Sequence, residues 1–392
     1  MILSTKEFGF SCPTKIEYGR GLVKRLNDKI QQLGKHEAIV ATDPGVAKAG
    51  LIDPIVATLK EMSIPTQVFA EVESNPRGET CDRVAALVKN PNDVFFIAVG
   101  GGSSIDTVKA AIVTVAHGGK TLDYQRGRKP VTKPCPPFIA IPTTAGTGAE
   151  VTPWAVITDT SQKKKVVIFG NQTWPTMAIL DPELTLSLPP KLTAETGMDA
   201  LTHLIEAFTS TYADPLTQAL TIKGIEMVGK WLRKAVANPN DLEARANMLV
   251  ASMLGGLALN YAGLGAVHAC SHPLGAFYDI GHGVANAIML PVVMKFNMIG
   301  CPELYKEVAR ALGVNVCGMN DYEAAEAAVE AVCKLNEDIG IPKNLKELGV
   351  PESELEELGR AALKETSNLC SNPRVPSEEQ LINIFKSAYY GE

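Results

Sequence analysis

The residues of this chain that could carry chemistry begin with its histidines, which are scarce and clustered. Only six occur among the 392 residues, and three of them fall in the segment GLGAVHACSHPLGAFYDIGHG at 263–283. A fourth, His203, follows Asp199 by four positions in a helical pattern, and His268 and His272 repeat that spacing. Because side chains four residues apart lie on one face of a helix, each pair points in a common direction.

Together with His282, which opens a further apolar helical pattern, these side chains are of the types that bind a divalent metal. Neutral imidazoles and one carboxylate form a mixed nitrogen and oxygen set that suits Fe(II) or Zn(II). A single histidine on an apolar face is more commonly a core residue, but four histidines with an aspartate indicate a metal site. The spacing leaves open whether His268 or His272 is the ligand, and the other would then relay a proton.

Two glycine-rich segments, each following an apolar run, form a second candidate site. In FFIAVGGGSSIDTVKAA (95–111) a strand pattern leads through three glycines into an amphipathic helix, and IPTTAGTGAE (141–150) also leaves a strand pattern. The first turn of a helix offers free N–H groups and partial positive charge, which suit a pyrophosphate. A tight strand-to-helix turn without a ligand is the alternative. Two such loops at successive strand ends predict one dinucleotide across the carboxyl ends of a parallel sheet.

Asp43 ends the first strand pattern, EAIVATD, and precedes Pro44. A carboxylate at this place accepts hydrogen bonds from an adenosine ribose and repels a 2′-phosphate, so it favours NAD over NADP. The alternative is an aspartate that only shapes the turn before Pro44.

The elements that must position these residues follow two different patterns, which meet near Pro189 and Pro190. Residues 1–187 alternate short β-branched runs with helical stretches, as is typical of a parallel sheet covered by helices on both faces. From 188 to 392 long helical patterns dominate and no strand pattern stands out. The predicted organisation is an NAD-binding α/β domain at 1–187 and an all-helical, metal-binding catalytic domain at 188–392.

The composition argues against several classes of function. Hydrophobic residues make up 46% and charged residues 20%, and the net charge of −6 includes no basic block that would bind nucleic acid. The first residues lack the pattern of a signal peptide, and no apolar run is long enough to predict a membrane span. The eight cysteines form no CxxC pair, as expected of reduced thiols. We therefore expect a cytoplasmic protein that acts on a small molecule.

Several long motifs resemble those of the iron-containing, or group III, alcohol dehydrogenases. They run nearly from end to end and are GGGSSIDTVKA, TTAGTGAEVT, ILDPELTLSLPP, TGMDALTHLIEA and AGLGAVHACSHPLGAFYDIGHGVANAIMLP. The resemblance implies a Rossmann-like α/β domain followed by an all-helical domain, the fold shared with dehydroquinate synthase, with the active site in the cleft between them. It also implies hydride transfer between NAD(H) and a small primary alcohol or aldehyde, aided by one divalent metal, Fe(II) before Zn(II). Homodimers or assemblies of dimers occur in this family, and the segment 8–19 is the expected contact.

The resemblance also assigns roles to individual residues. The metal ligands that it implies are Asp199, His203, His268 and His282, and His272 becomes the proton relay near the nicotinamide. The cofactor contacts that it implies, including the NAD-selecting position, are Asp43, Asn75, Gly100, Gly101, Gly102, Ser103, Asp106, Thr143, Thr144, Thr147 and Lys165. Trp154 and Leu259 are expected to line the substrate pocket unless both are only core residues. A tryptophan at this place narrows the pocket, which favours a small substrate.

Three other functions remain as alternatives. A zinc-dependent, glycerol-dehydrogenase-like polyol dehydrogenase shares the loops and the helical domain, but the Asp199–His203 pair and the spacing of HACSHPLGAFYDIGHG favour the iron type. A metal-dependent hydrolase has no use for two dinucleotide loops, and a non-catalytic NAD sensor has no use for a complete metal set. The substrate stays open among short alcohols and aldehydes, diols, hydroxy acids and sulfonated or phosphonated aldehydes, and so do the physiological direction and the native metal.

Overall fold

The computed structural model describes residues 7–162 and 164–391, which pack into two compact units. The α/β unit comprises residues 12–144 and 148–187, and the helical unit comprises residues 188–391 with two short segments, 7–11 and 145–147. The division expected at residue 187 places both short segments with the first domain, and that division stays a prediction.

Both short segments join the helical unit through contacts with its helices. The backbone N–H of Ser11 donates to the Tyr261 hydroxyl at 2.7 Å, and the rings of Phe10 and Tyr261 lie 4.6 Å apart. The carbonyl oxygen of Gly146 lies 3.3 Å from Nδ1 of His203. A loop that leaves a strand of the sheet therefore supplies residues to the other unit.

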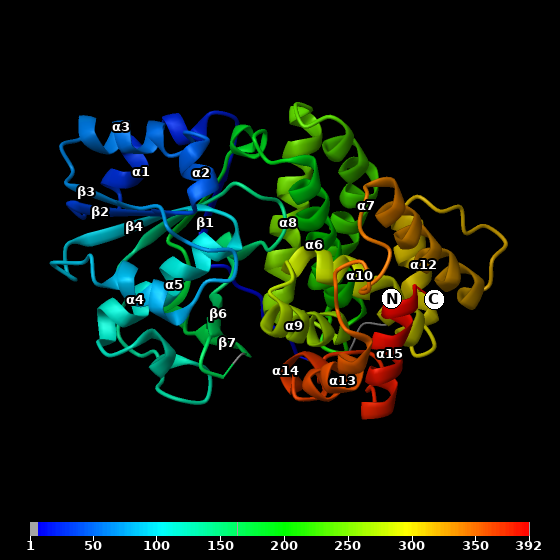
Figure 1. Ribbon diagram of the computed structural model, residues 1–392. Helices are drawn as coiled ribbons and strands as arrows, with labels where there is room; N and C mark the ends of the chain where they lie inside the picture. Colours follow the sequence, from blue (N-terminus) through cyan, green and yellow to red (C-terminus); the bar gives the residue numbers. More distant parts are fainter. Residues whose placement is uncertain (1–6, 163, 392) are drawn as a thin grey trace. The chain divides into compact units, whose positions relative to one another are not determined.

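A six-stranded parallel sheet forms the centre of the α/β unit, with the strand order β1-β8-β5-β4-β2-β3 (Figure 1). A separate antiparallel hairpin pairs β6 with β7. The strands are β1 (Lys15–Tyr18), β2 (Glu37–Thr42), β3 (Thr66–Phe69), β4 (Val94–Gly100), β5 (Phe138–Pro142), β6 (Trp154–Asp159), β7 (Lys164–Phe169) and β8 (Met177–Leu180).

Helices cover both faces of this sheet. They are α1 (Asn27–Gln31), α2 (Pro44–Lys48), α3 (Asp53–Glu61), α4 (Gly78–Ala85) and α5 (Gly102–His117), with 3-10 helices η1 (Leu22–Lys24), η2 (Thr121–Tyr124), η3 (Ala149–Val151), η4 (Asn171–Thr173) and η5 (Pro182–Thr185). Successive strand residues point to opposite faces. Val40 and Ile97 accordingly pack with α1 and α3, whereas Ile39 and Phe96 pack with α4 and α5. Figure 1 shows these two pairs of helices on opposite faces of the sheet.

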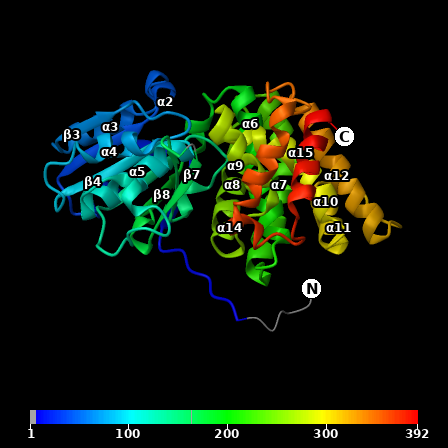
Figure 2. The ribbon, with the colours of Figure 1, turned by 60° about the horizontal axis from the view of Figure 1, so that its bottom comes forward.

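The helical unit begins where two prolines end the α/β pattern. Pro190 is the first residue of α6, a position that suits proline because the first N–H groups of a helix have no partner within it. The helices are α6 (Pro190–Thr209), α7 (Pro215–Ala237), α8 (Leu242–Ala262), α9 (Ala266–Tyr278), α10 (His282–Asn297), α11 (Pro302–Ala311), α12 (Asp321–Asp338), η6 (Glu352–Glu354), α13 (Leu355–Leu363), α14 (Thr366–Leu369) and α15 (Glu378–Tyr390). Figure 2 shows these helices packed against one another. Their buried apolar side chains form a large common cluster.

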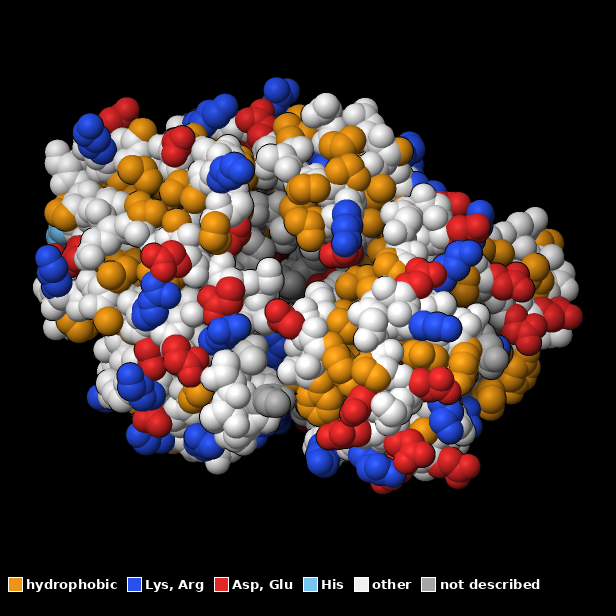
Figure 3. All heavy atoms as spheres, viewed as in Figure 1, with side chains coloured by type: hydrophobic (Ala, Val, Ile, Leu, Met, Phe, Trp, Pro, Cys, Tyr) orange, Lys and Arg blue, Asp and Glu red, His pale blue; other side chains and the backbone are white. Residues whose placement is uncertain are grey.

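The predicted fold class, a Rossmann-like α/β unit followed by an all-helical unit, is confirmed. In the part of the chain that the structure describes, no single helix is both long and apolar enough to cross a membrane. Taken together, α8 and α9 have the length and composition of a membrane span, but the pair is bent by 106°. Acidic and basic side chains are interspersed on the faces of both units that Figure 3 shows.

Candidate metal centre and glycine-rich loops

Four polar side chains from three helices converge inside the helical unit. Asp199 and His203 lie one turn apart on α6, His268 lies on α9, and His282 is the first residue of α10. Each offers one ligand atom, and these atoms all lie within 4.8 Å of one another. The first three side chains are buried and that of His282 is partly exposed. The structure thus brings together the four residues that the resemblance implies as ligands.

Lone-pair atoms face one another in this cluster. The Nε2 atoms of His203 and His268 are 3.1 Å apart, and Oδ1 of Asp199 lies 3.9 Å from Nε2 of His203 and 3.6 Å from Nε2 of His282. Burial holds the pKa of His268 well below its usual value, so its imidazole is neutral. Neutral imidazole nitrogens and a carboxylate oxygen at these separations fit a shared divalent cation.

Two further side chains support this cluster, and the sequence reasoning missed both. Glu206 on α6 accepts from the backbone N–H of Val267 at 2.7 Å, and its other oxygen lies 2.5 Å from Nδ1 of His268. Burial raises the pKa of Glu206 to about 7, although backbone N–H groups oppose the shift. Asn286 on α10 donates to Oδ1 of Asp199 at 2.7 Å. A polar residue one turn from a ligand, on an otherwise apolar helix face, is the signal that could have revealed each of them.

His272 lies outside the four-residue cluster but beside it. Its ring centroid is 5.7 Å from that of His282 and 6.1 Å from that of His268. Its Nδ1 lies 3.0 Å from a carboxylate oxygen of Glu365, the residue that precedes α14. Of the two histidines on α9, His268 is therefore the one in the cluster, while His272 faces a partly exposed carboxylate.

Both glycine-rich loops begin at the carboxyl ends of neighbouring strands of the α/β unit, β4 and β5. Gly100 has a φ of 147°, and a Cβ there would lie 2.4 Å from Oγ of Ser104, so the turn requires glycine. The N–H of Thr143 donates to the carbonyl of Gly100 at 3.0 Å, and a Cβ on Gly101 would lie 3.1 Å from Oγ1 of Thr144. The two loops therefore touch, as one ligand across both requires.

Asp43 occupies the end of β2, on the other side of β4. Its Oδ1 accepts from the N–H groups of Gly45 and Val46 at 2.9 and 3.0 Å, so it caps α2. Its Oδ2 would lie 3.2 Å from a Cβ placed on Gly100. Asp43 thus shapes the turn before α2, as the alternative interpretation of this residue expected. Its second carboxylate oxygen lies beside the first glycine-rich loop.

Two of the expected cofactor contacts, far apart in sequence, meet each other. Nζ of Lys165 on β7 donates to Oδ1 of Asn75 at 2.7 Å and to Oγ1 of Thr158 at 3.1 Å. Ser103, in the first turn of α5, reaches the same loop, because its hydroxyl donates to the carbonyl of Ser74 at 2.6 Å. These contacts connect α5 and the β6–β7 hairpin to the loop after β3.

The remaining expected site residues are more dispersed. Gly102 begins α5, and both carboxylate oxygens of the buried Asp106 are engaged, one by Nζ of Lys109 at 3.1 Å and one by the N–H of Val156 at 2.9 Å. Thr147 belongs to the helical unit. Their contact with a cofactor stays a prediction.

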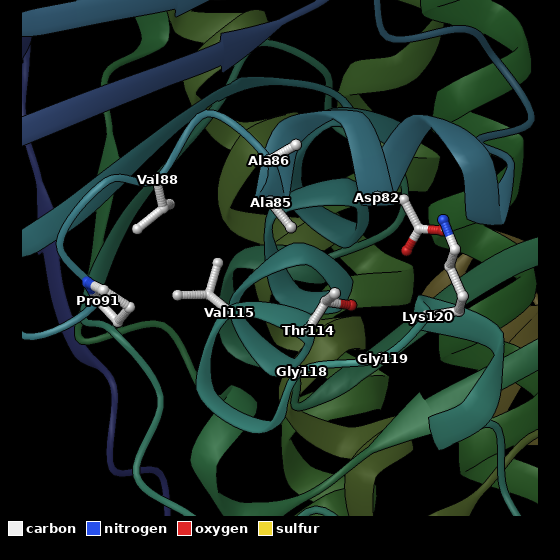
Figure 4. Close-up of a pocket in the computed structure, with 10 residues that line it drawn as sticks. All are labelled: Asp82, Ala85, Ala86, Val88, Pro91, Thr114, Val115, Gly118, Gly119 and Lys120. Carbon is white, nitrogen blue, oxygen red and sulfur yellow. The ribbon is translucent and has the colours of Figure 1, made fainter.

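The two expected pocket residues belong to different units. Trp154 begins β6 and stacks on Phe169 at a centroid distance of 4.1 Å, whereas Leu259 is half-buried on α8. A pocket lined by both stays a prediction. A separate cavity of about 350 Å³ in the α/β unit, shown in Figure 4, lies between α4, α5 and the loop after α5. None of the expected site residues lines it.

Known protein families match both units of this chain. Residues 13–182 match the model for the iron-containing alcohol dehydrogenase, and residues 193–389 match the model for the C-terminal part of the same family. This chain belongs to the iron-containing alcohol dehydrogenase family. The resemblance inferred from its motifs is confirmed.

Individual relatives match almost from end to end. A choline dehydrogenase of Bacillus subtilis is 40% identical over 382 residues, which cover 97% of this chain and 94% of the relative. An NAD-dependent methanol dehydrogenase of Bacillus methanolicus is 38% identical over 379 residues, 97% of this chain and 99% of the relative. The crystal structure of a 1,3-propanediol oxidoreductase superposes with a TM-score of 0.94 at 39% identity, covering 98% and 100% of the two chains.

The family establishes the class of reaction. The enzyme is an NAD-dependent alcohol dehydrogenase or aldehyde reductase that transfers hydride between NAD(H) and a small alcohol or aldehyde and uses a divalent metal. The predictions of enzyme class and cofactors are confirmed.

Proposed function

We propose that Asp199, His203, His268 and His282 hold the catalytic metal of this dehydrogenase and that the glycine loops hold its NAD(H). The observation that carries the first assignment is the convergence of four ligand atoms within 4.8 Å on buried, apolar helices. A divalent metal bound there supplies a Lewis acid that stabilises negative charge on the substrate oxygen. NAD bound at the loops supplies the acceptor, and NADH the donor, of the hydride.

The proton of the substrate hydroxyl is assigned to His272. Its Nδ1 faces the carboxylate of Glu365 at 3.0 Å, which favours the tautomer with the proton on Nδ1 and leaves Nε2 as an acceptor. The side chain of Glu365 is 27% exposed, so the pair connects the interior of the helical unit to solvent. His272 thus takes up the proton when an alcohol is oxidised and returns it when an aldehyde is reduced.

The cofactor is assigned to the carboxyl ends of β2, β4 and β5. The N–H groups at the start of α5 suit the pyrophosphate, because glycine at positions 100 to 102 lets the phosphates approach the backbone. Oδ2 of Asp43 accepts from the ribose hydroxyls and disfavours a 2′-phosphate by charge repulsion. The Asn75–Lys165 pair is a further contact at the edge of this site.

We propose a small primary alcohol, or the corresponding aldehyde, as the substrate. Three relatives are named for choline, methanol and 1,3-propanediol, which are all short alcohols. Their names support a short alcohol as the substrate of this chain too. Trp154, at the place expected to face the substrate, supports a narrow pocket. The zinc-dependent polyol dehydrogenase is the second candidate, since the same ligands accept Zn(II).

We propose further that the enzyme acts in the cytoplasm as a homodimer or an assembly of dimers. All eight cysteines are free thiols in the structure, which suits a reducing compartment. β1 is an edge strand of the sheet, and such edges commonly pair with another chain. Light scattering coupled to size-exclusion chromatography measures the state of assembly directly.

The experiment that tests the function is NADH oxidation with a panel of short aldehydes. Protein stripped with a chelator is assayed before and after anaerobic loading with Fe(II) or Zn(II), beside a His268→Ala variant. We expect activity that returns with metal in the wild type and not in the variant. Activity of the stripped wild type equal to that of the loaded protein would contradict the metal centre, and full activity with unchanged metal content in His268→Ala would contradict the ligand assignment.

A further inference from the structure

Glu206 is a buried carboxylate that lies immediately behind the metal centre. It follows His203 by three residues and Asp199 by seven, so all three lie on the same face of α6. Glu206 is only 4% exposed, and its side chain contacts the start of α9. A buried carboxylate is costly unless its oxygens are hydrogen-bonded, so its partners indicate what it does.

Both carboxylate oxygens face nitrogen atoms of α9. Oε1 accepts from the backbone N–H of Val267 at 2.7 Å, and Oε2 lies 2.5 Å from Nδ1 of His268. Gly265 makes this approach possible, because a Cβ at that position would lie 2.8 Å from Oε1. When Glu206 is ionised, above its raised pKa, its oxygens can only accept, so Nδ1 of His268 then carries the ring proton.

The proton on Nδ1 decides what the other ring nitrogen can do. A neutral imidazole has one N–H and one lone pair, so Nε2 of His268 is left with the lone pair. This Nε2 faces Nε2 of His203 at 3.1 Å, inside the cluster of ligand atoms. The opposite tautomer would place a hydrogen in the position where a metal has to bind.

We infer that Glu206 is a positioning residue that fixes His268 as the Nδ1–H tautomer and so presents Nε2 to the metal. The inference rests on the proposed metal centre and adds a residue to it. Carboxylates that hold a histidine ligand in this way commonly change metal affinity by about 10–100-fold when they are replaced.

A purely structural role for Glu206 predicts a different outcome. Its Oε1 satisfies a free N–H in the first turn of α9, as a helix cap does. The same terminus has a second cap, because Oδ1 of Asn372 accepts from the N–H of Ala266 at 3.0 Å. Asn372→Ala therefore weakens the start of α9 without touching the His268 ring, and it is the matched control.

Glu206→Gln tests the tautomer with almost no change in size. If the amide nitrogen faces His268, it donates to Nδ1 and moves the ring proton to Nε2. If the amide turns over, its nitrogen opposes the N–H of Val267, and two donors meet. The backbone N–H of Val267 can only donate, so the first orientation is favoured and the Nδ1–H tautomer of His268 is lost.

The measurements use metal-free protein with histidines labelled with ¹⁵N, in a buffer alkaline enough to keep imidazoles and carboxylates deprotonated. Two-bond ¹⁵N–¹H spectra report each tautomer, and the signals missing from His268→Ala assign His268. Zn²⁺ affinity is measured by competition with a chromophoric chelator, and thermal unfolding reports the stability of each variant.

We expect the wild type to show His268 as Nδ1–H. We expect Glu206→Gln to lose this tautomer and to bind Zn²⁺ about 10–100-fold more weakly. Asn372→Ala should unfold at a lower temperature and keep both the tautomer and the affinity. The inference is overturned if Glu206→Gln retains the wild-type tautomer and affinity, or if Asn372→Ala loses as much affinity as Glu206→Gln. Equal Zn²⁺ binding by the wild type and His268→Ala would overturn the proposed metal centre itself.

Discussion

At the scale of single residues, the two histidines of α9 show how neighbours separate similar side chains. His268 is buried among the ligand atoms and backed by Glu206, whereas His272 lies outside the cluster and faces Glu365. The same residue type, one turn apart, is therefore assigned to metal binding in one case and to proton transfer in the other.

The first prediction concerns His272→Ala. Removing a general acid–base group lowers kcat by about 10²–10⁴-fold, while metal content stays at the wild-type level because the ring is not in the cluster. Steady-state kinetics and metal analysis of the same preparation check both points. Glu365→Gln, which leaves the imidazole in place, should lose less activity. Loss of metal from His272→Ala would show that His272 is a ligand.

Glu150 carries the second prediction. Its carboxyl group is buried in the α/β unit, and its Oε1 has no hydrogen-bond partner among the described residues. Burial raises the pKa of Glu150 from 4.5 to about 7, although its own backbone and the charge of Lys109 oppose the shift. Between these two values the folded state binds more protons than the unfolded state, so stability falls as the pH rises through this window.

Glu150→Gln removes the cost of burying a charged carboxylate. The free energy of unfolding of the variant minus that of the wild type should therefore grow by up to roughly 3 kcal/mol between about pH 4.5 and pH 7. Above pH 7 this difference should stay constant. Urea unfolding at several pH values across this range measures the difference. A difference that does not depend on pH would mean that Glu150 titrates at an ordinary value in the folded protein.

At the scale of elements, the approach of α10 to α6 sets the position of His282 relative to Asp199. Gly283, in the first turn of α10, lies against the backbone of α6, and a Cβ there would be 2.4 Å from the carbonyl oxygen of Glu195. Backbone atoms cannot turn aside as a flexible side chain can. The missing side chain of Gly283 therefore permits the close approach of the two helices that carry His282 and Asp199.

Gly283→Ala is the third prediction. The added methyl group forces α10 away from α6, which should lower stability by about 1–3 kcal/mol and weaken Zn²⁺ binding. Chemical denaturation and chelator competition measure the two effects. Gly281→Ala is the matched control, since a Cβ there has its nearest contact at 3.6 Å and the residue has a φ of −57°. Equal behaviour of the two variants would show that the close approach is relieved elsewhere.

At the scale of the whole molecule, the proposed metal centre links metal binding to the folding of the helical unit. The four residues proposed as ligands come from α6, α9 and α10, so the cluster exists only when these helices are packed together. A ligand that binds only the folded state raises its stability with concentration, by about 2.7 kcal/mol at 100 times the dissociation constant.

The fourth prediction follows from this linkage. Stripping the metal should lower the unfolding temperature of the helical unit, and adding Zn²⁺ should raise it again in proportion to the logarithm of the free concentration. Differential scanning calorimetry across a metal titration measures the shift. His268→Ala should show no such dependence. A wild-type transition that does not respond to metal would argue that the four residues bind none.

Much of the fold and the donor set was determined by local features of the sequence. The β-branched runs and their intervening helices predicted the parallel sheet, and the glycines at positions 100 to 102 predicted the turn from β4 into α5. The four residues proposed as metal ligands were predicted from their types, their spacing and the family motifs, and the structure brings them together. Such patterns can be recognised in the sequence because they depend on the periodicity of residues that are close along the chain.

Only the tertiary structure decided how these side chains are held. The orientation of the His268 ring depends on Glu206, which lies 62 positions away on another helix, and Asp106 meets Val156 across 50 positions. The segment 145–147 leaves a strand of one unit and packs with the other. Hydrogen-bond partners and close backbone approaches depend on which elements pack together. The periodicity of the sequence does not determine which elements these are.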